Sequence, residues 1–544
     1  MLNKKLYCSS LTAKLISILL TIIFLLYIYT WGENILRLLL SKYPTEYRDM
    51  ATVQLTYLFS SGKNPYNLET SPPFFYLYGF LFSYLCAKLG SILYLTPLFI
   101  NKIAVVSCII IAGLVIGYEV AQLTKSLWLT ILAFTLMLDS GYNLSYFIVR
   151  PDSFGLLLTI LAIFLTKRSI SIPMLFIIAV ISVSSFYTKQ YYIYIIIPIS
   201  LYIACIKPKY LIFYGLFLIS TATISIFIIS KIFPYYFYAT IFAQAKSVNY
   251  NFGHMVNQNW QFFKFYLLLI IPVIYRLYTL TKQYCASTIL HNHKNSYYTA
   301  NYIAELKKSL SHSPINIYIL QIIISLICLM KLGGNEGAYM SYYNELLLPE
   351  FIVIALFIIN KYSKVHSELF NNTLKLFIAI WISLYGQNKI YLNNKSHDYS
   401  YENNINSNQE SWKKAYKILD MYASPKMFLS PILANYPLTH GIDIYDNGNT
   451  EYCTNLIPSK KYIMVQNILF PQLKALNIYY SDWIRNINDE VAHGEFSLVT
   501  SIQQMPDSLI NRTILQSKYK LYTILYLRTG EQVWATEFWV PINQ

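Results

Sequence analysis

The sequence has few charged residues. Asp, Glu, Lys and Arg make up 12% of its 544 residues, whereas an ordinary soluble domain carries about 25%. Hydrophobic residues make up 55%. Runs of about 20 apolar residues, the length that crosses the hydrocarbon core of a bilayer, recur through residues 1–391. This scarcity of charge excludes an ordinary soluble enzyme and predicts a polytopic α-helical membrane protein.

Acidic residues are scarcest in the apolar part of the chain. Of the 26 Asp and Glu residues, 12 lie in residues 1–391 and 14 lie in the shorter stretch 392–544. This shift predicts two domains: a transmembrane domain over residues 1–391 and a small soluble α/β domain over residues 392–544. The second domain shows one helical pattern and several strand patterns: Ser411–Tyr422 for the helix, and Lys426–Leu429, Lys461–Val465, Phe496–Thr500, Lys520–Arg528 and Gln532–Val540 for strands, the last two joined as a hairpin.

The sequence also lacks a disulfide framework and a metal-binding pattern. Its seven cysteines form no CxxC pair, and its eight histidines show no ligand spacing. The formal net charge is +16, but the positive residues lie in short loops between apolar runs, where they would face anionic lipid headgroups. We therefore expect membrane lipids as partners and no nucleic acid.

Basic residues predict the orientation in the membrane. Lys4, Lys5 and Lys14 precede the first apolar run, which predicts a cytoplasmic N-terminus and places the first loop, residues 31–72, on the outer face. Following the later loops in the same way predicts about eleven crossings of the cytoplasmic (inner) membrane and a periplasmic C-terminal domain. One region does not fit this predicted topology. Three apolar runs lie between Pro73 and Arg150, where the charges allow only an even number of crossings, so one run, or a merged pair, is not a separate full span.

The first outer loop carries four carboxylates, although the neighbouring runs have almost none. Asp49 begins a helical pattern that we expect to lie along the membrane surface and to end at a turn containing Gly62 and Pro65. A carboxylate held there could act as general base on an acceptor hydroxyl, and the candidates are Asp49 and Glu46. The alternative is that Asp49 only caps the helix.

Charged residues at the edges of later apolar runs form a second candidate set. Arg150-Pro151-Asp152 begins one run and Lys189-Gln190 ends another, and the predicted topology places both on the outer face. Charged groups at the edge of a membrane are costly and usually functional. Asp152 is a further catalytic candidate or a helix cap. Arg150, Lys189 and Gln190 suit a lipid-linked phosphate, and the alternative for the cations is contact with headgroups.

A third outer loop, Lys331–Glu345, contains three glycines and ends in Asn344 and Glu345. Glycine lets the backbone approach a ligand closely, so Asn344 and Glu345 are predicted to bind substrate; a plain connector is the alternative. Tyr66 is a further candidate for substrate binding, because aromatic side chains of outer loops can stack on sugar rings.

Together these motifs resemble the C-type superfamily of integral-membrane glycosyltransferases, in the branch that holds protein O-mannosyltransferases, aminoarabinose transferases and their bacterial relatives. The resemblance rests on an acidic residue, Asp49, followed by a helix and a G-x-x-P-Y turn. It rests also on R-P-D at residues 150–152, F-x-x-K-Q at residues 186–190, and a Gly-rich outer loop ending in N-E before a soluble tail. It covers the layout of the whole chain through short motifs.

The resemblance implies an inverting transfer of a sugar from a polyprenyl-phosphate donor to a hydroxyl of a lipid, glycan or protein acceptor in a bacterial cell envelope. Asp49 would activate the hydroxyl, and Arg150 and Lys189 would stabilise the leaving phosphate. Many members have adjacent Asp and Glu in the first loop, whereas Met50 follows Asp49 here. This departure leaves open whether Asp49 or Glu46 is the base and whether a divalent metal (Mg²⁺ or Mn²⁺) takes part.

Two other functions also fit a polytopic chain. A transporter or flippase of lipid-linked sugar or polysaccharide would explain the apolar runs and aromatic loops, but transporters often show repeated halves, and this sequence has no internal repeat. A non-catalytic envelope assembly protein would depend on its C-terminal domain and not on Asp49.

Overall fold

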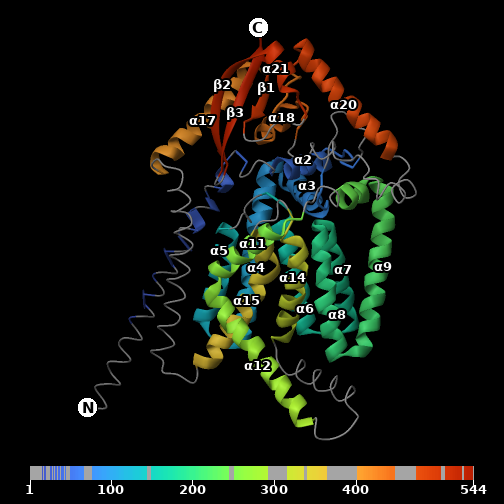
Figure 1. Ribbon diagram of the computed structural model, residues 1–544, viewed down its shortest axis with the longest axis vertical. Helices are drawn as coiled ribbons and strands as arrows, with labels where there is room; N and C mark the ends of the chain where they lie inside the picture. Colours follow the sequence, from blue (N-terminus) through green and yellow to red (C-terminus); the bar gives the residue numbers. More distant parts are fainter. Residues whose placement is uncertain are drawn as a thin grey trace.

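The computed structural model describes ten stretches of the chain and single positions between residues 15 and 44. The stretches are residues 49–66, 76–143, 149–243, 250–291, 315–335, 340–363, 401–446, 473–503, 509–529 and 532–542. The described elements form two parts (Figure 1): a bundle of helices, and a sheet domain built from residues 401–542 that lies over one end of the bundle. We call that end of the bundle the domain face and the other end the opposite face.

The bundle is made of apolar helices. Three of the described helices are long and apolar enough to cross a membrane, namely Pro97–Thr124, Pro208–Ile232 and Tyr342–Lys361, and a pair bent by 96° is a fourth if its two helices form one span. The scarcity of charge thus corresponds to a multi-pass membrane protein, while the number of crossings stays a prediction. The helices are α3 (Leu81–Leu93), α4 (Pro97–Thr124), α5 (Leu127–Asn143), α6 (Asp152–Arg168), α7 (Ile172–Thr188), α8 (Ile196–Ile206), α9 (Pro208–Ile232), α11 (Phe252–Phe265), α12 (Leu267–His291), α14 (Asn316–Leu332) and α15 (Met340–Ser363), with short segments η1 (Gln190–Ile195) and η2 (Tyr238–Ala243).

Helix α3 accounts for the odd number of apolar runs before Arg150. It has 13 residues, about 20 Å of helix, which is short of the roughly 30 Å hydrocarbon core. Both of its ends lie beside α2 (Asp49–Ser60), because Tyr76 before α3 is hydrogen-bonded to Thr52 at 3.0 Å and Asn101 after α3 donates to Thr56 at 2.9 Å. The chain therefore returns to the domain face before α4 begins. This favours α4 and α5 as the two crossings before Arg150, a count that stays a prediction.

Helix α2 has the predicted bounds but different surroundings. We expected its apolar residues to lie along the membrane surface, and this was wrong: its first eight residues are buried, and the helix lies between the bundle and the sheet domain (Figure 1). Met50 and Val53 pack against Ala434 and Ile444 of the sheet domain. An apolar stripe fits a protein surface as well as a lipid surface, so the sequence pattern alone does not separate the two.

In its described residues, the sheet domain has three antiparallel strands in the order β1-β3-β2. The predicted hairpin is confirmed, since Thr529 at the end of β2 pairs with Gln532 at the start of β3. Lys426–Leu429 is not a strand: its residues make only one isolated bridge, from Phe428 to Val499. Lys461–Val465 lies outside the described residues. The elements are α17 (Tyr401–Met421), η3 (Pro431–Leu433), α18 (Asn435–His440), α20 (Leu473–His493), β1 (Val499–Ile502), α21 (Arg512–Lys518), β2 (Tyr519–Thr529) and β3 (Gln532–Pro541).

Candidate functional site at the domain face

The charged motifs of the sequence meet where α6 begins, α7 ends and α15 begins. Asp152 is the first residue of α6, and Lys189 caps the C-terminus of α7. Their side chains form a buried ion pair. Two motifs that lie 37 residues apart in the sequence are therefore joined in one site.

Three tyrosine rings surround the Lys189 ammonium. Its Nζ lies 5.2 Å from the ring centroid of Tyr78, 4.8 Å from that of Tyr191 and 4.7 Å from that of Tyr342. Aromatic faces attract cations at such distances, more strongly where water is excluded. The cage and the Asp152 carboxylate together compensate for the cost of burying this charge.

Glu345 lies beside this cage on α15. Its Oε2 accepts hydrogen bonds from the hydroxyls of Tyr191 and Tyr192, the second at 2.6 Å. The Tyr192 ring rests against Gly155 of α6, where an added Cβ would lie 2.1 Å from the ring. The glycine thus allows α6 and η1 to approach closely enough to fix Tyr192 on the Glu345 carboxylate.

Several buried polar atoms around the cage have no hydrogen-bond partner in the described part of the chain. Buried polar groups are normally paired, so these groups can bind a polar ligand: the oxygens can accept from its hydroxyls, and Ser153 Oγ and Asn344 Nδ2 can donate to its hydroxyl or phosphate oxygens. The atoms without a partner are Ser153 Oγ, Asn344 Oδ1 and Asn344 Nδ2. The carboxyl groups of Asp152 and Glu345 lie within hydrogen-bonding reach of one another.

Asp49 is connected to this site through the segment before α6. Its side chain is fully buried, and Oδ1 accepts a hydrogen bond from the backbone N–H of Val149 at 2.9 Å. The next residue, Arg150, is half-buried and interacts electrostatically with Asp152. Asp49 therefore holds the segment that presents Arg150 and Asp152. Glu46, the other candidate base, lies outside the described residues.

Two side chains that were predicted to bind ligands, those of Gln190 and Tyr66, contact other parts of the protein in the structure. The Gln190 amide donates to the carbonyls of Leu77 and Thr240, at 2.9 Å each, and so ties three segments together. Tyr66 is buried, and its ring contacts Phe233 and Tyr236 at centroid distances of 5.4 Å and 5.1 Å. Binding of substrate by Tyr66 or of phosphate by Gln190 stays a prediction.

The glycines of the third loop also approach protein groups. An added Cβ at Gly334 would lie 2.3 Å from the Tyr250 ring, and one at Gly333 would lie 2.2 Å from the Tyr343 hydroxyl. These two glycines allow close packing of tyrosines, whereas we had expected them to allow the approach of a ligand.

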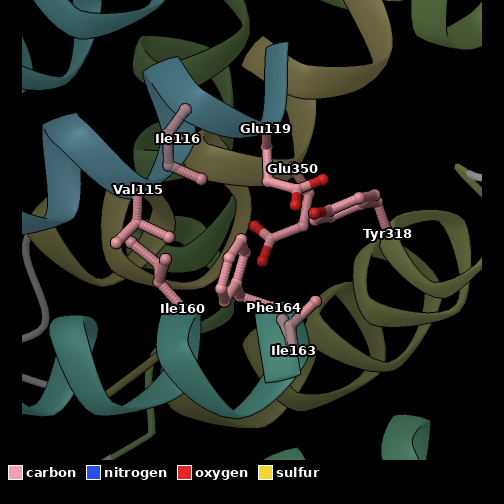
Figure 2. A pocket seen from close by; sticks show the side chains of 8 residues that line it. All are labelled: Val115, Ile116, Glu119, Ile160, Ile163, Phe164, Tyr318 and Glu350. Atoms are coloured by element: carbon pink, nitrogen blue, oxygen red, sulfur yellow. The ribbon is translucent and has the colours of Figure 1, made fainter. Parts of the chain in front are cut away.

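A second buried charge cluster lies towards the opposite face and was missed by the sequence analysis. Glu119 accepts hydrogen bonds from Lys167 and from Arg168, the latter at 3.0 Å. Figure 2 shows the Glu119 carboxylate near the Tyr318 hydroxyl and the Glu350 carboxylate. These three side chains, together with apolar ones, line a cavity of about 10 Å³, which is the size of one water. Carboxylates inside apolar runs are the signal that could have identified this cluster.

The described residues do not form a site for a divalent metal. No group of three or more His, Cys, Asp or Glu side chains within the described stretches is arranged to hold one. At the domain face, the ammonium of Lys189 lies beside Asp152 and Glu345, and the guanidinium of Arg150 also acts on Asp152. We therefore derive no step through a metal.

Comparison with known proteins identifies the fold. No protein-family model matches the chain, and no curated protein matches it. The structure is similar to the crystal structure of ArnT from Cupriavidus metallidurans bound to undecaprenyl phosphate, with a TM-score of 0.51 and 8% sequence identity over 95% of this chain and 97% of that chain. The chain therefore has the fold of the C-type integral-membrane glycosyltransferases, as the sequence motifs predicted.

Proposed function

We propose that this protein is a glycosyltransferase of the cytoplasmic (inner) membrane that moves a sugar from a polyprenyl-phosphate donor to an acceptor hydroxyl on the outer face. The observation that carries the proposal is the grouping of Arg150, Asp152, Lys189 and Glu345, with buried unpartnered polar atoms, at one end of an ArnT-like bundle. The donor class is suggested by the undecaprenyl phosphate named for that ArnT structure.

The reaction would be one displacement with inversion at the anomeric carbon. The acceptor oxygen forms the new bond to this carbon, the bond to the phosphate oxygen breaks, and the hydroxyl proton passes to Asp49 as general base. Negative charge then develops on the leaving polyprenyl phosphate. Arg150, which is half-buried, and Lys189 would stabilise it, because fixed positive groups act strongly where water is excluded.

The remaining groups would hold the substrates. Ser153 Oγ and the Asn344 amide are polar, buried and without a partner among the described residues, which suits the hydroxyls of a sugar. Glu345, which lies beside them and is hydrogen-bonded to Asp152, would bind the sugar as well. Asp152 also fixes the Lys189 ammonium through their ion pair. The sheet domain, on the periplasmic side in this proposal, would help to hold the acceptor, which could be a lipid, a glycan or a protein.

The test is donor turnover by purified protein. The wild type and Asp49→Asn would be mixed with a panel of polyprenyl-phosphate sugars and an envelope extract that supplies acceptors, and the release of polyprenyl phosphate would be followed. We expect release by the wild type and a loss of about 100-fold or more in Asp49→Asn, the usual size of a general-base contribution. Asp443→Asn, the same change at an exposed position of the sheet domain, is the matched control and should retain full activity.

Wild-type rates in Asp49→Asn would remove Asp49 from the proposed mechanism. An absence of release by the wild type with every donor would contradict the transferase proposal as a whole.

A further inference from the structure

Two buried carboxyl groups, those of Asp152 and Glu345, meet inside the site at the domain face. Asp152 is 9% exposed and Glu345 is 1% exposed. Lys189 forms an ion pair with Oδ1 of Asp152. The hydroxyls of Tyr191 and Tyr192 donate to Oε2 of Glu345. These contacts leave Asp152 Oδ2 and Glu345 Oε1, which receive no hydrogen from any other described group.

Tyr192 holds the two carboxyl groups together. Its hydroxyl oxygen lies 2.6 Å from Glu345 Oε2 and 3.0 Å from the backbone carbonyl oxygen of Asp152. Its ring rests against Gly155, in the first turn of α6. In this arrangement the carboxyl groups of Asp152 and Glu345 lie within hydrogen-bonding reach of one another.

A hydrogen bond between two carboxyl groups requires a proton on one of them. An ionised carboxylate can only accept hydrogen bonds, and two carboxylates that share a buried site repel one another, so that one of them keeps its proton. Asp152 is the ionised member, because Lys189 is its ion-pair partner and Arg150 also acts on it. The groups that donate to Glu345 are neutral hydroxyls. The proton therefore lies on Glu345.

We propose that Glu345 is a protonated, neutral carboxylic acid that donates to Asp152, and that this proton keeps the site positive for the phosphate of the donor. This inference rests on the proposed function. Among the four charged motif residues, Arg150 and Lys189 are positive and Asp152 is negative. The four together carry one net positive charge while Glu345 is protonated and none when it is ionised. A buried carboxylate at Glu345 would also repel the phosphate directly, most strongly where water is excluded.

Several titratable and charged groups face Glu345 from the elements packed around it. In the described part of the chain they are the Asp152 carboxylate at the start of α6, the Lys189 ammonium at the end of α7, the Tyr191 and Tyr192 hydroxyls of η1 and the Tyr342 hydroxyl of α15 itself. Phenol and ammonium groups ordinarily titrate near pH of about 10, and Asp152 is already ionised. Glu345 is therefore the first of these groups to lose a proton as the pH rises.

The first test is infrared spectroscopy of the purified protein in detergent, which needs no activity. A protonated carboxyl group has a carbonyl stretching band that an ionised carboxylate lacks. We expect the spectrum of the wild type minus that of Glu345→Gln, both at neutral pH, to contain this acid band and no carboxylate bands. Glu410→Gln, the same change at an exposed position, is the matched control, and its difference spectrum should contain carboxylate bands only.

Glu345→Asp is a second variant that keeps a carboxyl group in the site, and it decides the question if Glu345→Gln does not fold. Its difference spectrum should show a shifted acid band. Carboxylate bands without an acid band, in the difference spectrum of either Glu345 variant, would mean that Glu345 is ionised and would overturn the inference.

The second test is the binding of polyprenyl phosphate between pH of about 6 and about 10. Glu345→Gln cannot become negative, and its amide can donate to Asp152 and accept from the tyrosines as the protonated acid does. The phosphate itself titrates in the same way with both proteins, so the ratio of the wild-type Kd to the Glu345→Gln Kd reports the charge of Glu345. We expect a ratio near one at low pH that rises about tenfold or more at high pH, because like charges are then brought together. A ratio that does not change with pH would overturn the role of the proton in phosphate binding.

The infrared spectra separate this inference from the proposed function. If the acid band of Glu345 is present but the wild type turns over no donor, the transferase proposal has failed and the protonation of Glu345 stands. If the wild type turns over a donor but the difference spectrum contains carboxylate bands only, this inference alone has failed.

Discussion

Glu119 and Glu350 are two buried carboxylates in one cluster with different partners. Glu119 holds Lys167 and Arg168, whereas Glu350 Oε2 has no hydrogen-bond partner among the described residues. Removing one member of a buried ion pair leaves a buried charge and costs about 3–5 kcal/mol. Burial favours the neutral form of a carboxyl without an ion-pair partner, so an amide of similar size replaces Glu350 without breaking an ion pair of the described residues.

We therefore expect Glu119→Gln to lower the melting temperature of the purified protein and Glu350→Gln to leave it unchanged or raise it. The two substitutions are chemically the same, so each is the control for the other. Thermal unfolding in detergent measures the effect, and equal losses in both variants would contradict this account of the cluster.

The residues of the domain-face site could be predicted from the sequence in part. Arg150-Pro151-Asp152 and Lys189-Gln190 stand out because charge is rare in apolar runs. The pairing of Lys189 with Asp152 could not be predicted, because it depends on how α6 packs on α7. The cage could not be predicted either: its tyrosines lie at positions 78, 191 and 342, and nothing local distinguishes them from the rest of the 52 tyrosines.

Gly155 shows how one residue sets the contact between two elements, α6 and η1. An alanine there would place its Cβ 2.1 Å from the Tyr192 ring, so Tyr192 would have to leave Glu345 or α6 would have to shift. We expect Gly155→Ala to lower both the melting temperature and donor turnover. Gly215→Ala on α9 is the control, because nothing lies within 4 Å of its Cβ, and alanine stabilises a helix relative to glycine by about 0.5–1 kcal/mol. Similar effects of the two substitutions would contradict the role given to Gly155.

Glu537 joins the strands of the sheet domain to α21. Its carboxylate accepts hydrogen bonds from Arg512 at 2.7 Å, Gln503 at 2.9 Å, Ser501 at 2.8 Å and Trp539 at 3.1 Å. Burial alone would raise the pKa of Glu537, but these hydrogen bonds outweigh it and hold the pKa below its ordinary value.

The lowered pKa of Glu537 predicts how the stability of this domain varies with pH. The stabilisation from this group is fully present above the unfolded-state pKa of about 4.5 and is lost as the pH falls through the lower pKa of the folded state. Glu537→Gln should therefore be less stable than the wild type at pH 7, and the difference in melting temperature should narrow below pH of about 4.5. The control is Glu410→Gln at an exposed position, and its melting temperature should equal that of the wild type at every pH. A difference in melting temperature between Glu537→Gln and the wild type that does not change with pH would contradict this prediction.

At the scale of elements, the sequence predicts the apolar helices and the β2–β3 hairpin well, because each follows from a local periodicity. It fails where an element depends on its neighbours. Lys426–Leu429 has a strand pattern, but Pro425 and Pro431 confine it to a short segment with a single bridge. The chain likewise bends by 96° between α11 and α12, although the residues on both sides of Tyr266 are largely apolar.

The two domains of the whole molecule meet at α2, which is buried on both sides (Figure 1). The composition shift near residue 392 predicts a separate soluble domain, but not where it docks. Docking depends on an apolar stripe that could equally face lipid and on a stack between Tyr43 and Trp412, which are far apart in the sequence.

The path of the chain through the membrane is the whole-molecule property that most directly tests this arrangement. Because α3 returns to the domain face, Lys63 before it and Tyr94 after it should face the same side of the membrane, and Lys125 at the end of α4 should face the other. All three side chains are exposed. In a background without native cysteines, a membrane-impermeant maleimide should label Lys63→Cys and Tyr94→Cys in intact cells if the domain face is outside, and Lys125→Cys only after permeabilisation. Labelling of Lys63→Cys and Lys125→Cys in intact cells, with Tyr94→Cys labelled only after permeabilisation, would mean that α3 and α4 both cross the membrane. The charges of Lys167 and Arg168 would then need another explanation than the positive-inside rule.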